Sequence, residues 1–285
     1  MRTENEMYDL ILGIAKSDDR IKAVYMNGSR TNKAVPKDIF QDYDIVYVVE
    51  DTKSFIEDKD WINLFGEILY MQYPDECPYC PGDKKNSYGW LMQFADGTRI
   101  DLTVQTIDYA LRHIQDDKLC RILLDKESVL PDIEAATDCQ YWIQKPTKEQ
   151  YVFACNEFWW CTNNIAKGLW REEIPYVQDM TNHIVRRQLI TMLNWKAGIL
   201  TEWKVSTGKS SKYLYKWLSA EEWQMLMATY FDANVDHAWK SVFGMCELFR
   251  TAAQFVGGKL GWEYNEKEGK AARDFLEYVH QLPKK

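Results

Sequence analysis

Two aspartates open an apolar segment early in the chain. Asp42 and Asp44 lie one residue apart at the start of "YDIVYVV", and side chains at positions i and i+2 of a strand point to the same face of a sheet. Two carboxylates at that spacing repel each other, so either the pKa of one rises or a divalent cation joins them. Because both faces are apolar from Ile45 onward, we expect a central strand whose acidic end projects into a cleft.

A third carboxylate fits the same geometry. In "RIDLTV", Ile100, Leu102 and Val104 form one apolar face, which leaves Asp101 on the opposite face. If this strand lies near "YDIVYVV", Asp101 projects into the same cleft as the paired acids. Three carboxylates without a histidine favour an oxygen-liganded cation such as Mg²⁺. Mg²⁺ ions held about 3.5 to 4 Å apart are a standard device for in-line displacement at phosphorus.

The turn Gly28-Ser29-Arg30 offers the complementary anion-binding chemistry. A glycine lets the backbone approach a ligand closely, a hydroxyl and exposed N–H groups donate to phosphate oxygens, and an arginine neutralises them. Each part alone has a plainer interpretation: a simple turn, a solvated strand end, or, for Asp101, a surface residue flanking a hairpin. The joint pattern favours a site for a nucleoside triphosphate with its metal ions.

The elements that must position these residues alternate in type through the first half of the chain. Asp96-Gly97 joins two strand-like segments, "GWLMQFA" and "TRIDLTVQ", and is a strong hairpin signal. Together the elements predict a mixed sheet with helices packed on it. The other predicted elements are a helix over 6–15, an apolar strand over 21–27, the strand "YDIVYVV" and a helix over 59–70.

The second half is helical in pattern, with almost no strand-like alternation. Pro146 and a capping-box-like spacing from Thr147 to Gln150 predict a helix start. We therefore place a domain boundary there and predict an α+β fold, with a mixed sheet flanked by helices over 1–145 and a helical bundle over 146–285. Long amphipathic stretches begin near Thr147, Val177, Ala220 and His237.

Composition narrows the class of partner. A formal net charge of −8 argues against a protein that wraps a nucleic-acid backbone, because such binding depends on Lys and Arg; it suits a small cationic partner better. The absence of a long apolar run and of a leader-like N-terminus predicts no membrane segment and a cytoplasmic location. Cys77 and Cys80 have CxxC spacing but no second pair, so we interpret them as loop thiols rather than a zinc site. We expect a monomer or weak homodimer.

A Gly-Ser pair followed after a spacer by Asp-x-Asp resembles the signature of the DNA-polymerase-β-like nucleotidyltransferase superfamily. The segments "FWWCTNNIAKGLWREEIPYVQDM", "RRQLITMLNW" and "TGKSSKYLYKWL" resemble the helical domain of the aminoglycoside 6-adenylyltransferases, which modify streptomycin. The resemblance covers nearly the whole chain. It implies a nucleotidyltransferase domain over 1–145 and a helical substrate-binding domain over 146–285.

The resemblance implies transfer of AMP from Mg·ATP to a streptomycin hydroxyl, with release of pyrophosphate. Asp42 and Asp44 match the metal-binding pair, and the Gly28-Ser29-Arg30 turn matches the phosphate-binding turn. Asp101 matches the third acid, a metal ligand that also acts as general base toward the acceptor hydroxyl. A free Asp, with a pKa of about 3.9, is a weak base, so proximity and a metal-lowered hydroxyl pKa must compensate.

The helical domain is expected to close over the nucleotide. Lys209, Lys212 and Lys216 have helix-compatible spacing, and we predict that Lys212 reaches the triphosphate, with Tyr213 or Tyr215 near the adenine. A solvated lysine face is the alternative interpretation of this segment.

Streptomycin carries two guanidinium groups, so its pocket needs acids and flat aromatic surfaces. Arginines of the same helices, Arg171, Arg186 and Arg187, are alternative partners for such acids. The predicted pocket residues are Glu157, Trp160, Glu172, Glu173 and Asp179.

Other functions remain open on the sequence. The acceptor could be another aminoglycoside or a lincosamide, which would keep the fold and the chemistry. A non-catalytic nucleotide-binding homologue is a different class of protein, and the presence of all three acids counts against it. A polynucleotide polymerase is disfavoured by the net charge.

Overall fold

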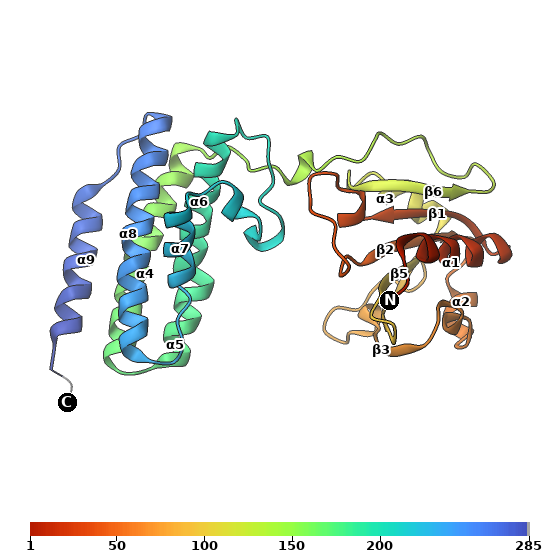
Figure 1. Ribbon diagram of the computed structural model, residues 1–285, viewed down its shortest axis with the longest axis horizontal. Helices are drawn as coiled ribbons and strands as arrows, with labels where there is room; N and C mark the ends of the chain where they lie inside the picture. The colour runs from red at the N-terminus through yellow and green to blue at the C-terminus, as the bar shows by residue number, and fades with distance from the viewer. Residues whose placement is uncertain (284–285) are drawn as a thin grey trace. The chain divides into compact units, whose positions relative to one another are not determined.

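The protein is described here by a computed structural model, which covers residues 1–283 in two compact units (Figure 1). The first unit comprises residues 1–140 and the second begins at Tyr141; the sequence analysis had placed the boundary between 145 and 146. Each unit buries its own apolar core. A mixed sheet with helices precedes a helical region along the chain, so the predicted α+β class is confirmed.

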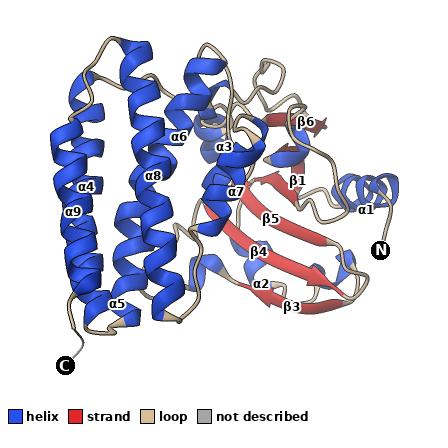
Figure 2. Cartoon of the chain, turned by 60° about the vertical axis from the view of Figure 1, so that its left-hand side comes forward, coloured by secondary structure: helices blue, strands red, loops and turns tan. Residues whose placement is uncertain are grey.

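The first unit is built on a six-stranded sheet with the order β3-β4-β5-β2-β1-β6. The central strands β2 and β5 are parallel, and the other neighbouring strands pair antiparallel. Figure 2 shows this sheet in red. The strands are β1 (Ile21–Asn27), β2 (Tyr43–Val49), β3 (Ile68–Gln72), β4 (Ser87–Phe94), β5 (Arg99–Thr106) and β6 (Cys120–Asp125).

Helices cover both faces of the sheet. Met7 and Ile11 of helix α1 (Glu4–Ser17) pack on one face, in the same core as Tyr47. On the other face, Ala110 of helix α3 (Ile107–His113) packs in a core with Val46. The remaining helical segments of this unit are α2 (Lys53–Glu57) and 3-10 turns at Ser29–Thr31, Trp61–Phe65, Pro74–Glu76 and Cys139–Tyr141.

Most predicted elements of the first unit are confirmed, but the helix over 59–70 is wrong. The structure has a 3-10 turn at Trp61–Phe65 and then β3, separated by Gly66 with a φ of 120°. That φ lies outside the helical region and suits glycine, so the helical pattern stops there. Trp61 and Phe65 are buried in the sheet core, which explains an apolar spacing that resembles a helix.

The second unit consists of helices, several of which run side by side in both ribbon views (Figures 1 and 2). Thr147 caps helix α4 through the predicted capping box with Gln150. Phe158 of α4 stacks on Phe249 of α8, with ring centroids 3.7 Å apart. The segments are α4 (Lys148–Trp170), α5 (Ile174–Asp179), a π-helical stretch (Met180–Val185), α6 (Arg186–Leu200), 3-10 turns at Lys209–Ser211 and Leu214–Lys216, α7 (Ala220–Ala228), α8 (Val235–Leu260) and α9 (Glu266–Gln281).

The lysine segment of the second unit is not the helix that its spacing suggested. Two short 3-10 turns replace it, and Ser210 and Ser211 have positive φ values that interrupt any regular helix. In residues 1–283 we find no helix with the length and apolar character needed to cross a membrane.

Candidate active site

Strand pairing brings two of the predicted acids together. In the parallel β2–β5 pair, Asp44 is the direct partner of Asp101, and Asp42 lies immediately before β2. Asp101 alternates with Ile100 and Leu102, which are buried in the α1-side core, so its carboxylate lies on the face that α3 covers. The predicted convergence of strands "YDIVYVV" and "RIDLTV" is therefore present, at the centre of the sheet.

Two of the three acids at this site have raised pKa values. Burial, followed by the charges of the Asp101 and Asp42 carboxylates, raises the pKa of Asp44 from 3.8 to about 6. Burial also raises the pKa of Asp42, an effect that the nearby Arg99 partly offsets. Both carboxyls therefore ionise less readily than free ones, first because they are removed from solvent and then because neighbouring carboxylates repel their charge. A divalent cation would offset that repulsion.

Arg99 is a site residue that the sequence analysis missed. Its guanidinium donates from Nε to Asp101 Oδ1 and from Nη2 to Asp101 Oδ2, both at 2.8 Å. Its Nη1 lies 3.5 Å from Asp42 Oδ2. Arg99 is two residues before Asp101 on the same strand, and this i, i+2 spacing was the available signal.

Gly28 has a positive φ of 76° and lies against Asp44. A Cβ at this position would lie 3.0 Å from Asp44 Cγ and closer still to its Oδ2. Only glycine both adopts this conformation freely and leaves that space. The Gly28 N–H donates to the Leu119 carbonyl at 3.0 Å. The Gly-Ser turn and the Asp-x-Asp strand are thus in direct contact, as their joint occurrence predicted.

Arg30 makes contacts different from those expected of a phosphate ligand. Its guanidinium donates to the backbone carbonyls of Gln41 and Asp42, at 2.8 and 3.1 Å, and lies 3.7 Å from the centroid of the Tyr43 ring. Only 9% of its side chain is exposed. These contacts hold the backbone that leads into β2, so Arg30 positions Asp42 in this structure. Ser29, half-buried, begins the 3-10 turn beside it.

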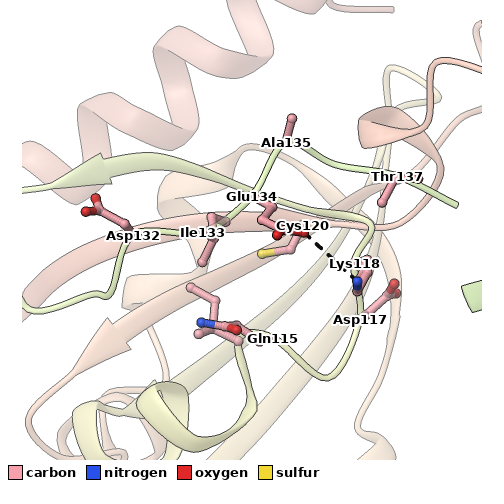
Figure 3. Close-up of a pocket in the computed structure, with 10 residues that line it drawn as sticks. Gln115, Asp117, Lys118, Cys120, Asp132, Ile133, Glu134, Ala135 and Thr137 are labelled. Atoms are coloured by element: carbon pink, nitrogen blue, oxygen red, sulfur yellow. Dashed lines mark ion pairs between the residues drawn. The ribbon is translucent and has the colours of Figure 1, made fainter. Parts of the chain in front are cut away.

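A cavity of about 220 Å³ opens beside β6 (Figure 3). Ile114 and Ile133 give it apolar walls, and Asp117, Lys118 and Cys120 line it as well. The charge of Asp117 makes a minor contribution to the raised pKa of Asp44. No sequence motif identifies Asp117, because its position relative to Asp44 depends on the path of the chain into β6.

The donor set suits Mg²⁺, since it consists of oxygens from three carboxylates beside a single guanidinium. As they stand, no three His, Cys, Asp or Glu side chains among residues 1–283 are arranged so that they could hold a metal ion. Both oxygens of Asp101 are drawn to Arg99 instead. Of the CxxC pair, Cys77 is half-buried and Cys80 exposed, and both are free thiols.

In the second unit, the predicted nucleotide residues surround one tyrosine. The ammonium groups of Lys212 and Lys216 lie 5.0 and 4.7 Å from the centroid of the Tyr213 ring, within cation–π range. Tyr215 is exposed and packs edge-on against Trp223. Lys209 is exposed in the preceding turn.

The predicted antibiotic residues separate into two groups. Glu157 lines an open groove of about 580 Å³ together with His183 and Arg187. Asp179 does not line that groove, but its Oδ1 lies 3.8 Å from Nε2 of His183, which does. The other acids lie on the α4–α5 turn, where Glu173 pairs with Arg171 at 3.8 Å, and Glu172 has a positive φ.

Trp160 does not line the groove of Glu157. Its side chain, which is 68% exposed, borders a second groove of about 500 Å³ with Lys167 and Phe275. Trp160 and Glu157, both candidates for the antibiotic pocket, thus line different grooves in this structure. The two grooves are completed by different helices: residues of α9 line the groove of Trp160, and residues of α6 line that of Glu157.

Comparison with known proteins covers nearly the entire chain. The model of the family described as "Streptomycin adenylyltransferase" matches residues 1–279. An aminoglycoside 6-adenylyltransferase from Campylobacter jejuni is 39% identical over 93% of this chain and 91% of its own, and one from Bacillus subtilis is 38% identical over 93% of both chains. A crystal structure of an aminoglycoside 6-adenyltransferase from Bacillus subtilis is 33% identical, covers 99% of this chain and 100% of its own, and gives a TM-score of 0.49.

These relatives are adenylyltransferases by name, and the two curated sequences align over both units of the chain. The predicted enzyme class, an adenylyltransferase, is therefore confirmed. The family match begins at residue 1 and so includes the Gly-Ser turn, the paired acids and Asp101 together with most of the helical unit. The chain belongs to the streptomycin adenylyltransferase family.

Proposed function

We propose that this enzyme transfers AMP from ATP to a hydroxyl of streptomycin and releases pyrophosphate. The observation that carries the proposal is the direct pairing of Asp44 with Asp101 on β2 and β5, with Asp42 beside them. Family membership supports adenylyl transfer to an aminoglycoside, and streptomycin is the member of that class that the family description names.

The reaction exchanges a phosphoanhydride bond of ATP for a phosphoester bond to the acceptor. The acceptor oxygen bonds to the α-phosphorus of ATP, the bond from that phosphorus to the pyrophosphate oxygen breaks, and the hydroxyl proton leaves. Asp101 would accept the proton, because its carboxylate is partly exposed and on the same face as Asp44. A positioned carboxylate contributes about 10²- to 10⁴-fold as a general base.

Asp42 and Asp44, with Asp101, would hold Mg²⁺, which we propose as the cofactor, two ions being the expected number. When bound, the ions neutralise phosphate charge and lower the pKa of the acceptor hydroxyl. Gly28 leaves Asp44 room to orient, and Arg30 fixes the carbonyl end of Asp42. The chain thus supplies mainly position and charge, which is where catalysis of phosphoryl transfer largely arises.

We also propose binding roles for residues of the second unit. Lys212 remains our predicted triphosphate ligand, and Tyr213 or Tyr215 the predicted contact for adenine. For the cationic antibiotic, the groove with Glu157 is the better-supported surface, because it pairs an acid with the aromatic rings of Phe153 and Trp195.

An acceptor screen tests this function. Purified protein with ATP and MgCl₂ is mixed with streptomycin, kanamycin or lincomycin, and both pyrophosphate release and acceptor mass are measured. We expect release with streptomycin and a product heavier by one adenylyl group. Turnover with kanamycin or lincomycin but not with streptomycin would contradict streptomycin as the acceptor. Binding of Mg·ATP without turnover on any acceptor would instead indicate a non-catalytic homologue.

A further inference from the structure

Two arginines flank the three acids, and they are held in different ways. Arg30 is 9% exposed and is bound to backbone carbonyls and an aromatic ring, so moving it would disturb the chain leading into β2. Arg99 has a side chain that is 41% exposed. Its polar contacts are with the carboxylates of Asp42 and Asp101.

The contacts of Arg99 are those that a bound cation would need. A planar guanidinium that donates two parallel bonds to one carboxylate is a strong and specific arrangement. Here it satisfies both oxygens of Asp101, and its third nitrogen faces Asp42. A Mg²⁺ ion requires those same oxygens. Because two positive charges beside one carboxylate repel each other, the guanidinium and a metal ion liganded by Asp101 compete for the site.

We propose that Arg99 is an internal counter-ion, which holds the acids in the metal-free enzyme and is displaced when Mg²⁺ binds. This inference rests on the metal site of the proposed function. The Arg99 side chain has room to move away from the acids, because it is long, substantially exposed and attached at the first residue of β5. The acids keep a partner in both states, which avoids strong repulsion between them when no metal is present.

The exchange also controls the proposed base. While Arg99 is in place, each oxygen of Asp101 already accepts a hydrogen bond from it, and a paired carboxylate is a weaker acceptor for the proton of a hydroxyl. Departure of Arg99 frees Asp101 in the same event that brings the metal. Arg99 is thus a positioning residue that couples metal binding to release of the base.

Direct titration with Mn²⁺ tests this competition without relying on activity. Chelator-treated full-length protein is titrated with Mn²⁺ alone, and free Mn²⁺ is measured by electron paramagnetic resonance. Arg99→Gln removes a positive charge that competes with Mn²⁺ for the carboxylates. Solvent screens part of this effect, because the Arg99 side chain is partly exposed. We expect Arg99→Gln to bind Mn²⁺ with a Kd lower by roughly tenfold.

Matched variants make the outcome specific. Arg121 lies on β6 and donates to Tyr8 rather than to the acids, so Arg121→Gln should leave the Kd for Mn²⁺ unchanged. Arg99→Lys keeps the charge but not the two-pronged contact, and should give an intermediate Kd; it also serves if the glutamine variant folds poorly. Asp44→Asn should weaken Mn²⁺ binding strongly.

The two levels of the proposal fail in distinguishable ways. If Asp44→Asn loses Mn²⁺ while Arg99→Gln and Arg99→Lys bind it no more tightly than the wild type, the metal site stands and the counter-ion role of Arg99 is overturned. If Asp44→Asn binds Mn²⁺ as well as the wild type, the metal site itself is wrong, and with it the proposed mechanism.

Discussion

Asp44 and Asp101 are direct partners on the parallel strands β2 and β5 at the centre of the sheet. This pairing fixes two carboxylates next to each other by main-chain hydrogen bonds rather than by flexible loops. Sites built on strands in this way are held more precisely than sites on loops. Burial at this position, together with the neighbouring carboxylates, raises the pKa of Asp44 to about 6, which links the architecture of the sheet to its proposed role in metal binding.

Gly28→Ala should damage the site directly. The new Cβ would lie 3.0 Å from Asp44 Cγ, at a backbone φ of 76°, so we expect a loss of stability of about 1 to 3 kcal/mol together with a loss of AMP transfer. Urea unfolding and a pyrophosphate-release assay measure the two effects.

Gly13→Ala is the matched control for that variant. Gly13 lies within α1 and a Cβ there would meet no atom within 4 Å, so alanine should stabilise the helix by about 0.5 to 1 kcal/mol. Normal activity in Gly28→Ala would show that AMP transfer does not require the close approach of the Gly28 backbone to the Asp44 carboxylate.

The pKa of Asp44 predicts how stability depends on pH in chelator. The folded protein holds a proton on Asp44 more readily than the unfolded chain does, because the pKa rises from 3.8 to about 6 on folding. Stability should therefore fall as pH increases through that window. Asp44→Asn removes this effect and should be more stable than the wild type above pH 6, by about 1 to 3 kcal/mol.

Denaturant unfolding in EDTA over this pH range measures the difference between the two proteins. Added Mg²⁺ should stabilise the wild type and not Asp44→Asn, because a ligand of the folded state shifts unfolding by mass action. Equal stability of the two proteins at every pH would contradict the raised pKa.

Arg186 should be important for the stability of the helical unit. Its side chain is buried, donates to the Thr229 carbonyl at 2.7 Å and to the Thr229 hydroxyl, and lies 3.8 Å from the centroid of the Tyr230 ring. Arg186→Met leaves the carbonyl at the end of α7 without this donor, and we expect a loss of about 2 to 3 kcal/mol.

The neighbouring arginine provides the comparison. Arg187 is exposed, so Arg187→Met should change the free energy of unfolding by less than about 0.5 kcal/mol. Thermal or denaturant unfolding of the two variants distinguishes them. A similar small effect for both would show that burial of the Arg186 guanidinium contributes little net stability.

The sequence was most informative where local pattern and burial agree. Strand β1 occupies the predicted residues 21–27, and the hairpin turn falls at Asp96-Gly97, where Gly97 has a φ of 85°. The pairing of Asp44 with Asp101 could be expected because both strands alternate toward the same face. These features depend on backbone periodicity, which is readable from residue order.

The parts that could not be predicted depend on tertiary contacts. Gly66 converts a helix-like pattern into a turn and an edge strand, and positive φ values at Ser210 and Ser211 break the lysine segment. In the site, Arg99 was missed because an arginine beside three acids has no motif of its own. Which groove receives Glu157 or Trp160 depends on how α4 packs against α6 and α9.

The most direct measurement compares AMP transfer and Mg·ATP binding in Asp101→Asn and Asp42→Asn. Asparagine at position 101 keeps the shape of the side chain but cannot take the proton, so we expect transfer to fall by about 10²- to 10⁴-fold while calorimetry shows near-normal Mg·ATP binding. Asp42→Asn should weaken both. Near-normal turnover by Asp101→Asn would contradict the assignment of Asp101 as the general base.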